Sequence, residues 1–211
     1  MLTKFDVRWN GAVPILMHNG QLANPRNPIV QAIKKITSLP PKQKSTDENL
    51  LRLATLEWVG GLYFTGDVAI GDKIAFSPKA KVIIPADVIY GCVVSGARKQ
   101  RLGELMQSSF LIDDDATFEY EGPKDLNVLM QDDRYISIRR AGVKGSAVMR
   151  TRPIFKTWQI SFSCMVDTES IDEKSFIQAM RDAGRYKGVG DYSPRFGRFW
   201  VEEVTNTGVV E

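Results

Sequence analysis

Residues 184–204 read GRYKGVGDYSPRFGRFWVEEV, and this stretch decides how the C-terminal part of the chain folds. Its glycines at 188, 190 and 197 let the backbone adopt positive φ and approach a ligand closely. Cations beside such a loop suit a phosphate group or another anion. The stretch therefore predicts an anion-binding glycine loop, whose cations are Arg185, Lys187, Arg195 and Arg198.

This loop connects a helix pattern to a strand pattern. Residues 158–166 alternate apolar and polar side chains, which is typical of a strand with one buried face. An apolar stripe at helical spacing follows over 176–183, and Gly184 is expected to end that helix. Another alternating segment starts at Phe199. Residues 156–204 are therefore predicted to form a β-α-β unit.

The rest of the chain mixes both patterns. Strand patterns occupy 2–9, 81–84 and 109–120, and helix patterns occupy 28–38, 46–60 and 88–97. Asn27-Pro28 is typical of an N-cap followed by proline at the first helical position, and Ser45-x-x-Glu48 resembles a capping box. Residues 42–44, between two helices, read as a solvated turn. We predict an α+β fold in which residues 1–211 form a single compact domain.

Residues 134–152 predict an arginine-rich β-hairpin with a turn at Gly142-Val-Lys-Gly145. Like charges on facing strands repel, so the fold gains little from placing them there. A ribbon of this kind can follow the phosphates of a nucleic acid. The alternative is that its cations pair with the acidic run 113–133, within the chain or in a neighbouring subunit. The candidate binding residues of the hairpin are Arg139, Arg140, Lys144, Arg150 and Arg152.

Charge is distributed unevenly along the chain, although its net charge is only +3. Residues 113–133 contain eight acids and one lysine, whereas residues 134–200 contain thirteen basic residues and six acids. Unlike surfaces of this kind suit head-to-tail contact between copies, so we expect a homo-oligomer. The alternative is a solvated surface whose charges happen to segregate.

Aromatic residues lie among the cations of the glycine loop. Tyr186, Tyr192, Phe196 and Trp200 alternate with them, a pattern that suits stacking of unpaired bases with phosphate contact. We favour Tyr192 as the stacking platform, with Arg195 and Arg198 on phosphate. The alternative is that Phe196 and Trp200 are core residues.

Few residues suggest catalysis, a metal or a membrane. His18 is the only histidine and no Cys-x-x-Cys pair occurs, so we expect no zinc site and no cofactor. Cys92 and Cys164 lie in apolar runs and are expected to be buried free thiols. Asp113-Asp114-Asp115 is expected to be an acidic turn rather than a magnesium site, because adjacent strand carboxylates point to opposite faces. The absence of a signal peptide or membrane span predicts a cytoplasmic protein.

The glycine loop resembles that of the RAMP superfamily, the RNA-binding proteins of CRISPR systems. The family pattern is Gly-apolar-Gly, about five residues and then Gly-x-Gly. This chain has Gly188-Val-Gly190, six residues and then Gly197-Arg-Phe199, so phenylalanine replaces the last glycine. The segment 83–101, IIPADVIYGCVVSGARKQR, is also similar to an early helix of RAMP backbone subunits. The resemblance implies a ferredoxin-like β-α-β-β-α-β core and an RNA partner.

A second resemblance spans most of the chain. The motifs Asn27-Pro-Ile-Val-x-x-Ile-Lys-Lys-Ile-Thr37, Glu57-x-x-Gly-Gly-Leu-Tyr63, Met149-Arg-Thr-Arg-Pro-Ile-Phe155 and Gly190-Asp-x-x-Pro-Arg-x-Gly-Arg-Phe199 are similar to those of uncharacterised bacteriophage and prophage proteins. This resemblance implies a phage setting, hence the host cytoplasm, and nucleic-acid metabolism, virion assembly or interference with host defence.

Together these features predict a protein that binds single-stranded RNA or DNA without cleaving it. One alternative is a metal-independent endoribonuclease, in which His18 would act as general acid or base because its pKa lies near working pH. Others are a virion assembly protein and an inhibitor of host defence that binds a host protein.

Overall fold

The computed structural model describes residues 1–143 and 146–210, and the chain divides into two compact units. The sheet unit comprises Met1–Ile15, Ile83–Glu121 and Phe155–Glu211, and the ribbon unit comprises Leu16–Val82 and Gly122–Ile154. Both units mix helices with antiparallel strands, which confirms the α+β prediction. Behaviour as one compact domain stays a prediction.

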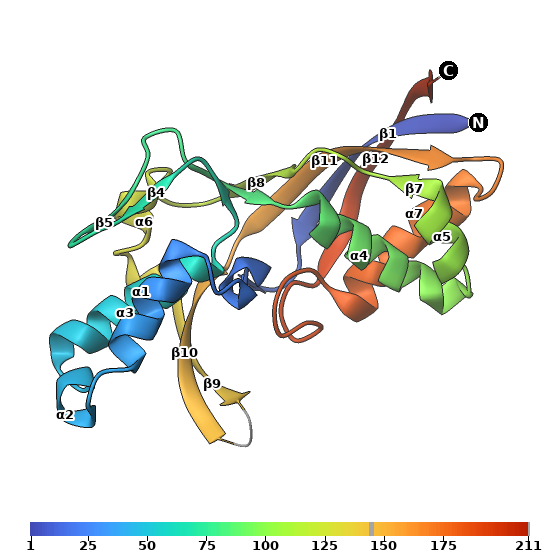
Figure 1. The fold of residues 1–211 in the computed structure, drawn as a ribbon. Helices are drawn as coiled ribbons and strands as arrows, with labels where there is room; N and C mark the ends of the chain where they lie inside the picture. Colours follow the sequence, from blue (N-terminus) through green and yellow to red (C-terminus); the bar gives the residue numbers. More distant parts are fainter. Residues whose placement is uncertain (144–145, 211) are drawn as a thin grey trace. The chain divides into compact units, whose positions relative to one another are not determined.

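The sheet unit is organised around an antiparallel sheet with the strand order β12-β1-β11-β8-β6 (Figure 1). Strand β1 pairs with β11 on one side and β12 on the other, so these two run parallel to each other across it. The short β7 pairs with one end of β11. The strands are β1 (Leu2–Gly11), β6 (Lys81–Ile84, which enters this unit at Ile83), β7 (Phe110–Leu111), β8 (Ala116–Tyr120), β11 (Trp158–Asp167) and β12 (Phe199–Val210).

Helices α4 (Ala86–Ala97) and α7 (Glu173–Asp182) cover one face of this sheet (Figure 1). The core lies between them and the strands: the Phe176 ring of α7 lies 5.3 Å from Phe5 of β1, centroid to centroid. Trp9 of β1 stacks on Phe199 of β12 at 4.0 Å. The buried alternation predicted for residues 2–9 and 158–166 is confirmed. A short helix α5 (Gly103–Ser109) follows α4.

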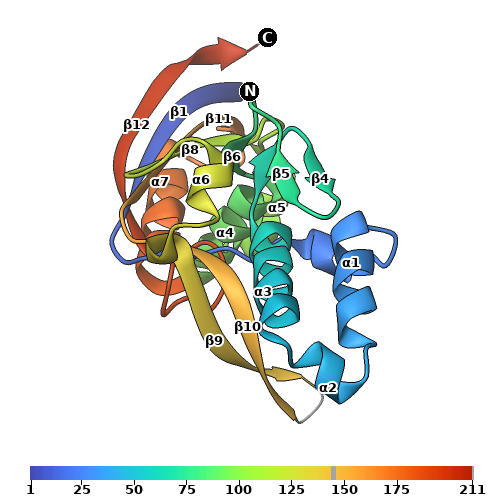
Figure 2. The ribbon, with the colours of Figure 1, turned by 90° about the vertical axis from the view of Figure 1, so that its left-hand side faces the viewer.

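The ribbon unit contains a long two-stranded ribbon, β9 (Ile136–Val143) and β10 (Ser146–Phe155), which runs as a curved pair of strands in Figure 2. This confirms the predicted hairpin strands, whereas Lys144 and the centre of the turn lie outside the described residues. The unit's other elements are β2 (Ile15–Leu16, which enters this unit at Leu16), β3 (Phe64–Thr65), β4 (Val68–Ile70), β5 (Ile74–Phe76), α1 (Pro28–Thr37), α2 (Pro41–Lys44), α3 (Asp47–Gly61) and α6 (Leu126–Leu129).

Side-chain hydrogen bonds tie separate elements of the ribbon unit together. One of them comes from helix α3. The Trp58 Nε1 of α3 donates to the carbonyl oxygen of Tyr135 at 2.8 Å, and Tyr135 lies in the turn before β9. The Asn127 side chain accepts from the backbone N–H of Phe76 at 2.8 Å and donates to the Phe76 carbonyl at 3.2 Å, which ties α6 to β5. Each bond satisfies a polar group inside the unit.

Three local predictions were wrong. Residues 42–44 belong to helix α2, which starts with proline at its first position. The N-cap of α3 is Thr46 rather than Ser45, because the Ser45 hydroxyl donates to the Pro41 carbonyl at 2.7 Å and closes α2 instead. The chain does not leave helical structure at Gly184 but continues as a π-helical turn, Ala183–Lys187. Gly184 is required because a Cβ there would overlap the Phe199 carbonyl.

No helix in the described residues combines the length and apolar character needed to cross a bilayer.

Candidate nucleic-acid interface

The β9–β10 register separates the predicted hairpin cations into two groups. Arg139 lies directly opposite Arg150, and Ser137 lies opposite Arg152. Directly opposed residues share a face, so Arg139, Arg150 and Arg152 lie on one side of the ribbon. The Arg139 Nε donates to the Ser137 hydroxyl at 2.9 Å. Arg140 lies on the other side, opposite Met149, next to Ile138; both of these apolar side chains are exposed.

Glu57 of α3 is the counter-charge on the arginine side. One carboxylate oxygen forms an ion pair with Arg150 Nη1, and the other accepts from the backbone N–H of Thr151 at 2.8 Å. Glu57 is buried, and burying a carboxylate is costly unless it is paired and hydrogen-bonded. The acid that meets Arg150 therefore comes from α3, not from the acidic run 113–133. That run supplies Asp132, which pairs with Arg134 at 2.6 Å and has a lowered pKa because of this hydrogen bond.

A pocket of about 530 Å³ opens beside this ion pair, within the ribbon unit. Its charged lining consists of Lys34, Arg150 and Arg152 against the single carboxylate of Glu57, and His18 also lines it. Arg152 is only 8% exposed, whereas His18 is exposed and its carbonyl accepts from the Tyr63 hydroxyl at 3.0 Å. Apolar side chains of α1 and the preceding turn complete the wall. The pocket is suited to an anion.

Sequence reasoning missed Lys34 and Glu57. Both lie far along the chain from residues 150–152, so spacing gave no link between them. One signal was present: Glu57 is an acid inside the apolar run Leu56–Gly61, where a carboxylate needs a partner.

In the sheet unit, the glycine loop has the predicted backbone. Gly188, Gly190 and Gly197 have φ of 77°, 85° and 72°. The Val189 N–H donates to the Gly197 carbonyl at 2.9 Å, and a Cβ on Gly197 would overlap the Val189 carbonyl. Glycine is therefore required because two backbone segments meet here.

The cations of this loop lie against aromatic rings and in two separate hollows. Lys187 lines a small hollow beside Cys92 on α4, and Arg185 and Arg198 line a larger one beside Trp200. The Arg185 guanidinium lies 5.3 Å from the Tyr186 ring, and Lys99 Nζ lies 4.1 Å from the same ring. These distances fit cation–π contacts.

Arg195 and Tyr192 occupy the turn between Gly190 and Gly197. The Arg195 guanidinium lies 5.9 Å from the ring of Phe196, which is buried. Tyr192 is exposed and has a φ of 53°. Its role in base stacking stays a prediction.

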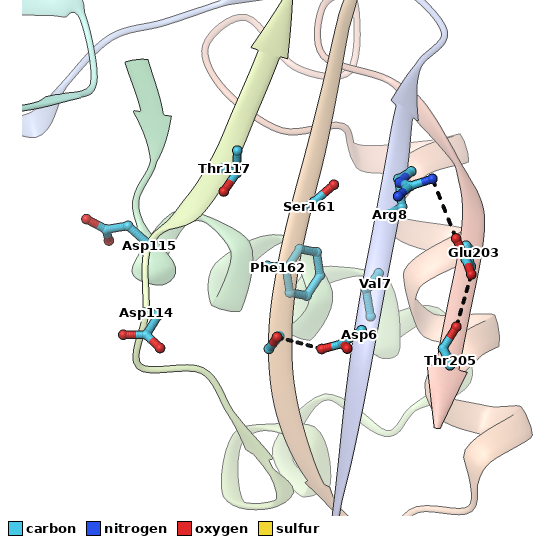
Figure 3. Close-up of a pocket in the computed structure, with 11 residues that line it drawn as sticks. Asp6, Val7, Arg8, Asp114, Asp115, Thr117, Ser161, Phe162, Glu203 and Thr205 are labelled. Carbon is cyan, nitrogen blue, oxygen red and sulfur yellow. Dashed lines mark hydrogen bonds and ion pairs between the residues drawn. The ribbon is translucent and has the colours of Figure 1, made fainter. Parts of the chain in front are cut away.

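The uncovered face of the sheet has the opposite charge (Figure 3). A broad hollow of about 530 Å³ on this face is lined by the carboxylates Asp6, Asp114, Asp115 and Glu203. Arg8 is the cation in that lining and lies 3.6 Å from Glu203. Carboxylates repel phosphate, so this face does not suit nucleic acid bound flat on a sheet.

Two expectations about reactive groups can be compared with the geometry. Cys92 and Cys164 are both free and buried, as predicted, and burial raises the pKa of each thiol to about 12. The thiols are therefore protonated at neutral pH and are not nucleophiles. Asp115 accepts from the Ala86 N–H at 3.1 Å at the start of α4. Among the described residues, no three or more His, Cys, Asp or Glu side chains are arranged to hold a metal ion.

No family model matches the chain, and no curated protein matches it in sequence.

Proposed function

We propose that the chain binds single-stranded nucleic acid without cleaving it, through the arginines of the β9–β10 ribbon and of the C-terminal loop. The observation that carries this proposal is the arginine side of the ribbon. Arg139 directly opposes Arg150, Arg152 follows on the same face, and Lys34 lines the same pocket as Arg150 and Arg152. Like charges on facing strands repel, and phosphate oxygens bound between them would relieve this repulsion.

A ferredoxin-like core is proposed for the sheet unit. In chain order its elements are β1, α4, β8, β11, α7 and β12, and the sheet order is β12-β1-β11-β8 with antiparallel neighbours. This corresponds to the β-α-β-β-α-β arrangement with strand order 4-1-3-2. The ribbon unit then consists of two insertions, one after β1 and one after β8. The arrangement supports the RAMP resemblance, and with it RNA as the partner.

Single strands are favoured over duplexes because exposed aromatic rings accompany the cations. Tyr186, Tyr192 and Trp200 are all exposed on the sheet unit. Unpaired bases stack on such rings while phosphates contact arginine. In a duplex the base faces stack on one another, so they are not free to stack on these aromatic rings.

Assembly into a homo-oligomer is part of the proposal. The uncovered sheet face is acidic, and the ribbon is basic with exposed Ile138 and Met149. Docking of the Arg140 side of one copy's ribbon on the sheet face of the next would join unlike charges, cover these apolar side chains and leave the Arg139 side open. Repeated copies would place arginine ribbons along one strand.

The test is the salt dependence of binding to single-stranded RNA and DNA. Arg139→Ala with Arg140→Ala removes one cation from each side of the ribbon, so the slope of log K against log salt should fall by about 0.7 for each of the two that contacts phosphate. The matched control, Lys73→Ala with Lys79→Ala, removes two exposed lysines of the same unit and should leave the slope unchanged. Salt-insensitive binding that the arginine variant does not alter would contradict the proposal.

A second candidate, metal-independent RNA cleavage, is favoured by one observation: His18 shares its pocket with Lys34, Arg150 and Arg152. Histidine can transfer protons and the cations can stabilise a charged transition state. Glu57 would position Arg150, since both its oxygens are occupied. Cleavage should survive EDTA, spare DNA and disappear in His18→Ala while RNA binding remains. Intact RNA after prolonged incubation with the wild type would dismiss this candidate.

The remaining candidates make different predictions. A virion assembly protein should oligomerise without nucleic acid and show no salt-sensitive affinity for it. An inhibitor of host defence should form a complex with a host protein that excess single-stranded nucleic acid does not disrupt.

A further inference from the structure

Trp200 is unlike the other tryptophans of the chain. Trp9, Trp58 and Trp158 are buried, whereas Trp200 is 57% exposed. It is the second residue of β12, next to Phe199, which is buried against Trp9. A single exposed aromatic side chain is ordinary on a protein surface, so what Trp200 does depends on the residues around it.

Trp200 lines a hollow of about 560 Å³ in the sheet unit, which we call the tryptophan hollow. Its cations are Arg181, Arg185 and Arg198, from the end of α7, the π-helical turn and the residue before β12. Its walls include Gly184, Val13 and Val201. The volume lies within the range of small-ligand sites.

The three arginines have no acidic partner within residues 1–143 and 146–210: none belongs to an ion pair. Arg181 lies in the last turn of α7, where the helix dipole favours a cation. Arg185 lies in the last turn of the π-helical continuation and contacts the Tyr186 ring, whereas the dipole does not account for Arg198. The lining of the hollow thus holds three arginines and no carboxylate, a composition that suits an anion.

We propose that the tryptophan hollow binds one unpaired nucleotide, with its base stacked on the Trp200 indole and its phosphate held by Arg181, Arg185 and Arg198. An apolar ring alone would suit many partners, and arginines alone would suit any anion. Their combination in one hollow selects a ligand with a flat aromatic part and a phosphate a few ångströms away. The inference rests on the proposed function and assigns it a base-binding site; Arg181 and Trp200 become binding residues.

Tryptophan fluorescence tests this directly, because Trp200 is the exposed indole. Adenosine 5′-monophosphate should quench the emission of the wild type. Adenosine should quench only at higher concentration, and inorganic phosphate should compete without quenching. In Trp200→Phe the quenchable component should be absent, since the remaining indoles are buried. Arg181→Ala with Arg185→Ala should weaken the monophosphate response and leave the adenosine response unchanged.

Binding to a single-stranded oligonucleotide provides the second measurement. Trp200→Ala should lower the affinity at least tenfold at fixed salt, whereas Trp200→Phe should retain most of it. Unchanged thermal unfolding of both variants shows that the fold is intact. The salt slope should not change in Trp200→Ala, which separates stacking from the phosphate contacts of the ribbon.

Two results would overturn the inference. Salt-sensitive oligonucleotide binding with no monophosphate quenching and no loss in Trp200→Ala would leave the proposed function standing without this site. Emission that shifts with protein concentration but not with nucleotide would assign the hollow to contact between copies. If the monophosphate quenches emission but substitution of the ribbon arginines does not change oligonucleotide binding, the nucleotide site in the tryptophan hollow stands. The ribbon is then not the nucleic-acid interface.

Discussion

Two arginine-rich regions of this chain are held in place by different means. In the ribbon unit, Arg150 is fixed by an ion pair with the buried Glu57, which also holds the Thr151 N–H. In the sheet unit, Arg195 and Arg198 flank Gly197, a glycine at positive φ whose position only a residue without a Cβ can take. One region depends on charge and the other on backbone shape.

The difference separates the roles of the two regions. An arginine that shares a buried carboxylate already contributes to folding, so its presence alone is weak evidence for a ligand. Arg181, Arg185 and Arg198 have no ion pair in the described part of the chain, although they line the same hollow. The tryptophan hollow is therefore the cleaner place to look for an external anion.

The largest effect is expected from Gly197→Ala. Alanine would have to adopt a φ of 72° with its Cβ against the Val189 carbonyl, which should lower the free energy of unfolding by at least about 3 kcal/mol. Urea unfolding measures the loss. The control is Gly91→Ala in α4, where a Cβ meets open space and helix propensity should raise stability by up to about 1 kcal/mol. Equal effects of the two variants would show that backbone shape does not hold the loop.

Next in size is Glu57→Gln. The amide keeps the shape but removes the charge that Arg150 and Thr151 share, at an expected cost of about 2 kcal/mol. Glu48→Gln, on the exposed first turn of the same helix, should change stability by less than about 0.5 kcal/mol. A neutral or stabilised Glu57→Gln would mean that the ion pair does not hold the ribbon.

A conservative exchange sharpens the comparison. Arg150→Lys keeps the charge but loses the guanidinium geometry, and should cost about 1 kcal/mol. Arg198→Lys should leave stability unchanged, because Arg198 has no ion pair in the described residues. Oligonucleotide binding should nevertheless weaken in Arg198→Lys. The comparison breaks if Arg198→Lys is the more destabilised variant.

The smallest effect is expected at Asp167, a carboxylate that is held by a serine hydroxyl and not by an arginine. The Ser170 hydroxyl donates to Asp167 at 2.6 Å, and this hydrogen bond is the largest cause of an Asp167 pKa of about 2. A lowered folded-state pKa gives stability that is present above the unfolded value and lost as the pH falls toward 2. The stability gap between wild type and Asp167→Asn should therefore close over this acidic range. Urea unfolding midpoints of both proteins at pH 5 and pH 2 measure this stability difference. An equal difference at the two pH values would mean that the Ser170 hydrogen bond does not stabilise the charged form of Asp167.

Much of the local structure could be predicted from the sequence because it depends on period and caps. The alternation of β1 and β11, the stripe of α7 and the Asn27-Pro28 start of α1 all appear as expected. The division into two units could not be predicted, because each unit is assembled from separate segments with no linker between them.

The candidate sites were harder to predict because they depend on contacts between distant residues. The pocket around Arg150 draws on positions 18, 34 and 57, and no spacing connects these. The alternating pattern at the start of β12 predicted that Trp200 and Phe199 lie on opposite faces of the strand. Whether the Trp200 side chain is exposed depends on the residues that pack around the strand. Lys144, a predicted binding residue, lies outside the described residues and stays a prediction.

The pairing of β1 has a consequence for synthesis on the ribosome. Leu2 lies opposite Asp167 on one side and opposite Val210 on the other, so β1 pairs only with strands that are made much later than itself. Until then Phe5, Val7 and Trp9, which the finished fold buries, form an apolar strand with two open edges. During synthesis both edges of β1 therefore stay unpaired until β11 emerges, which is the stage at which this strand is most prone to aggregate.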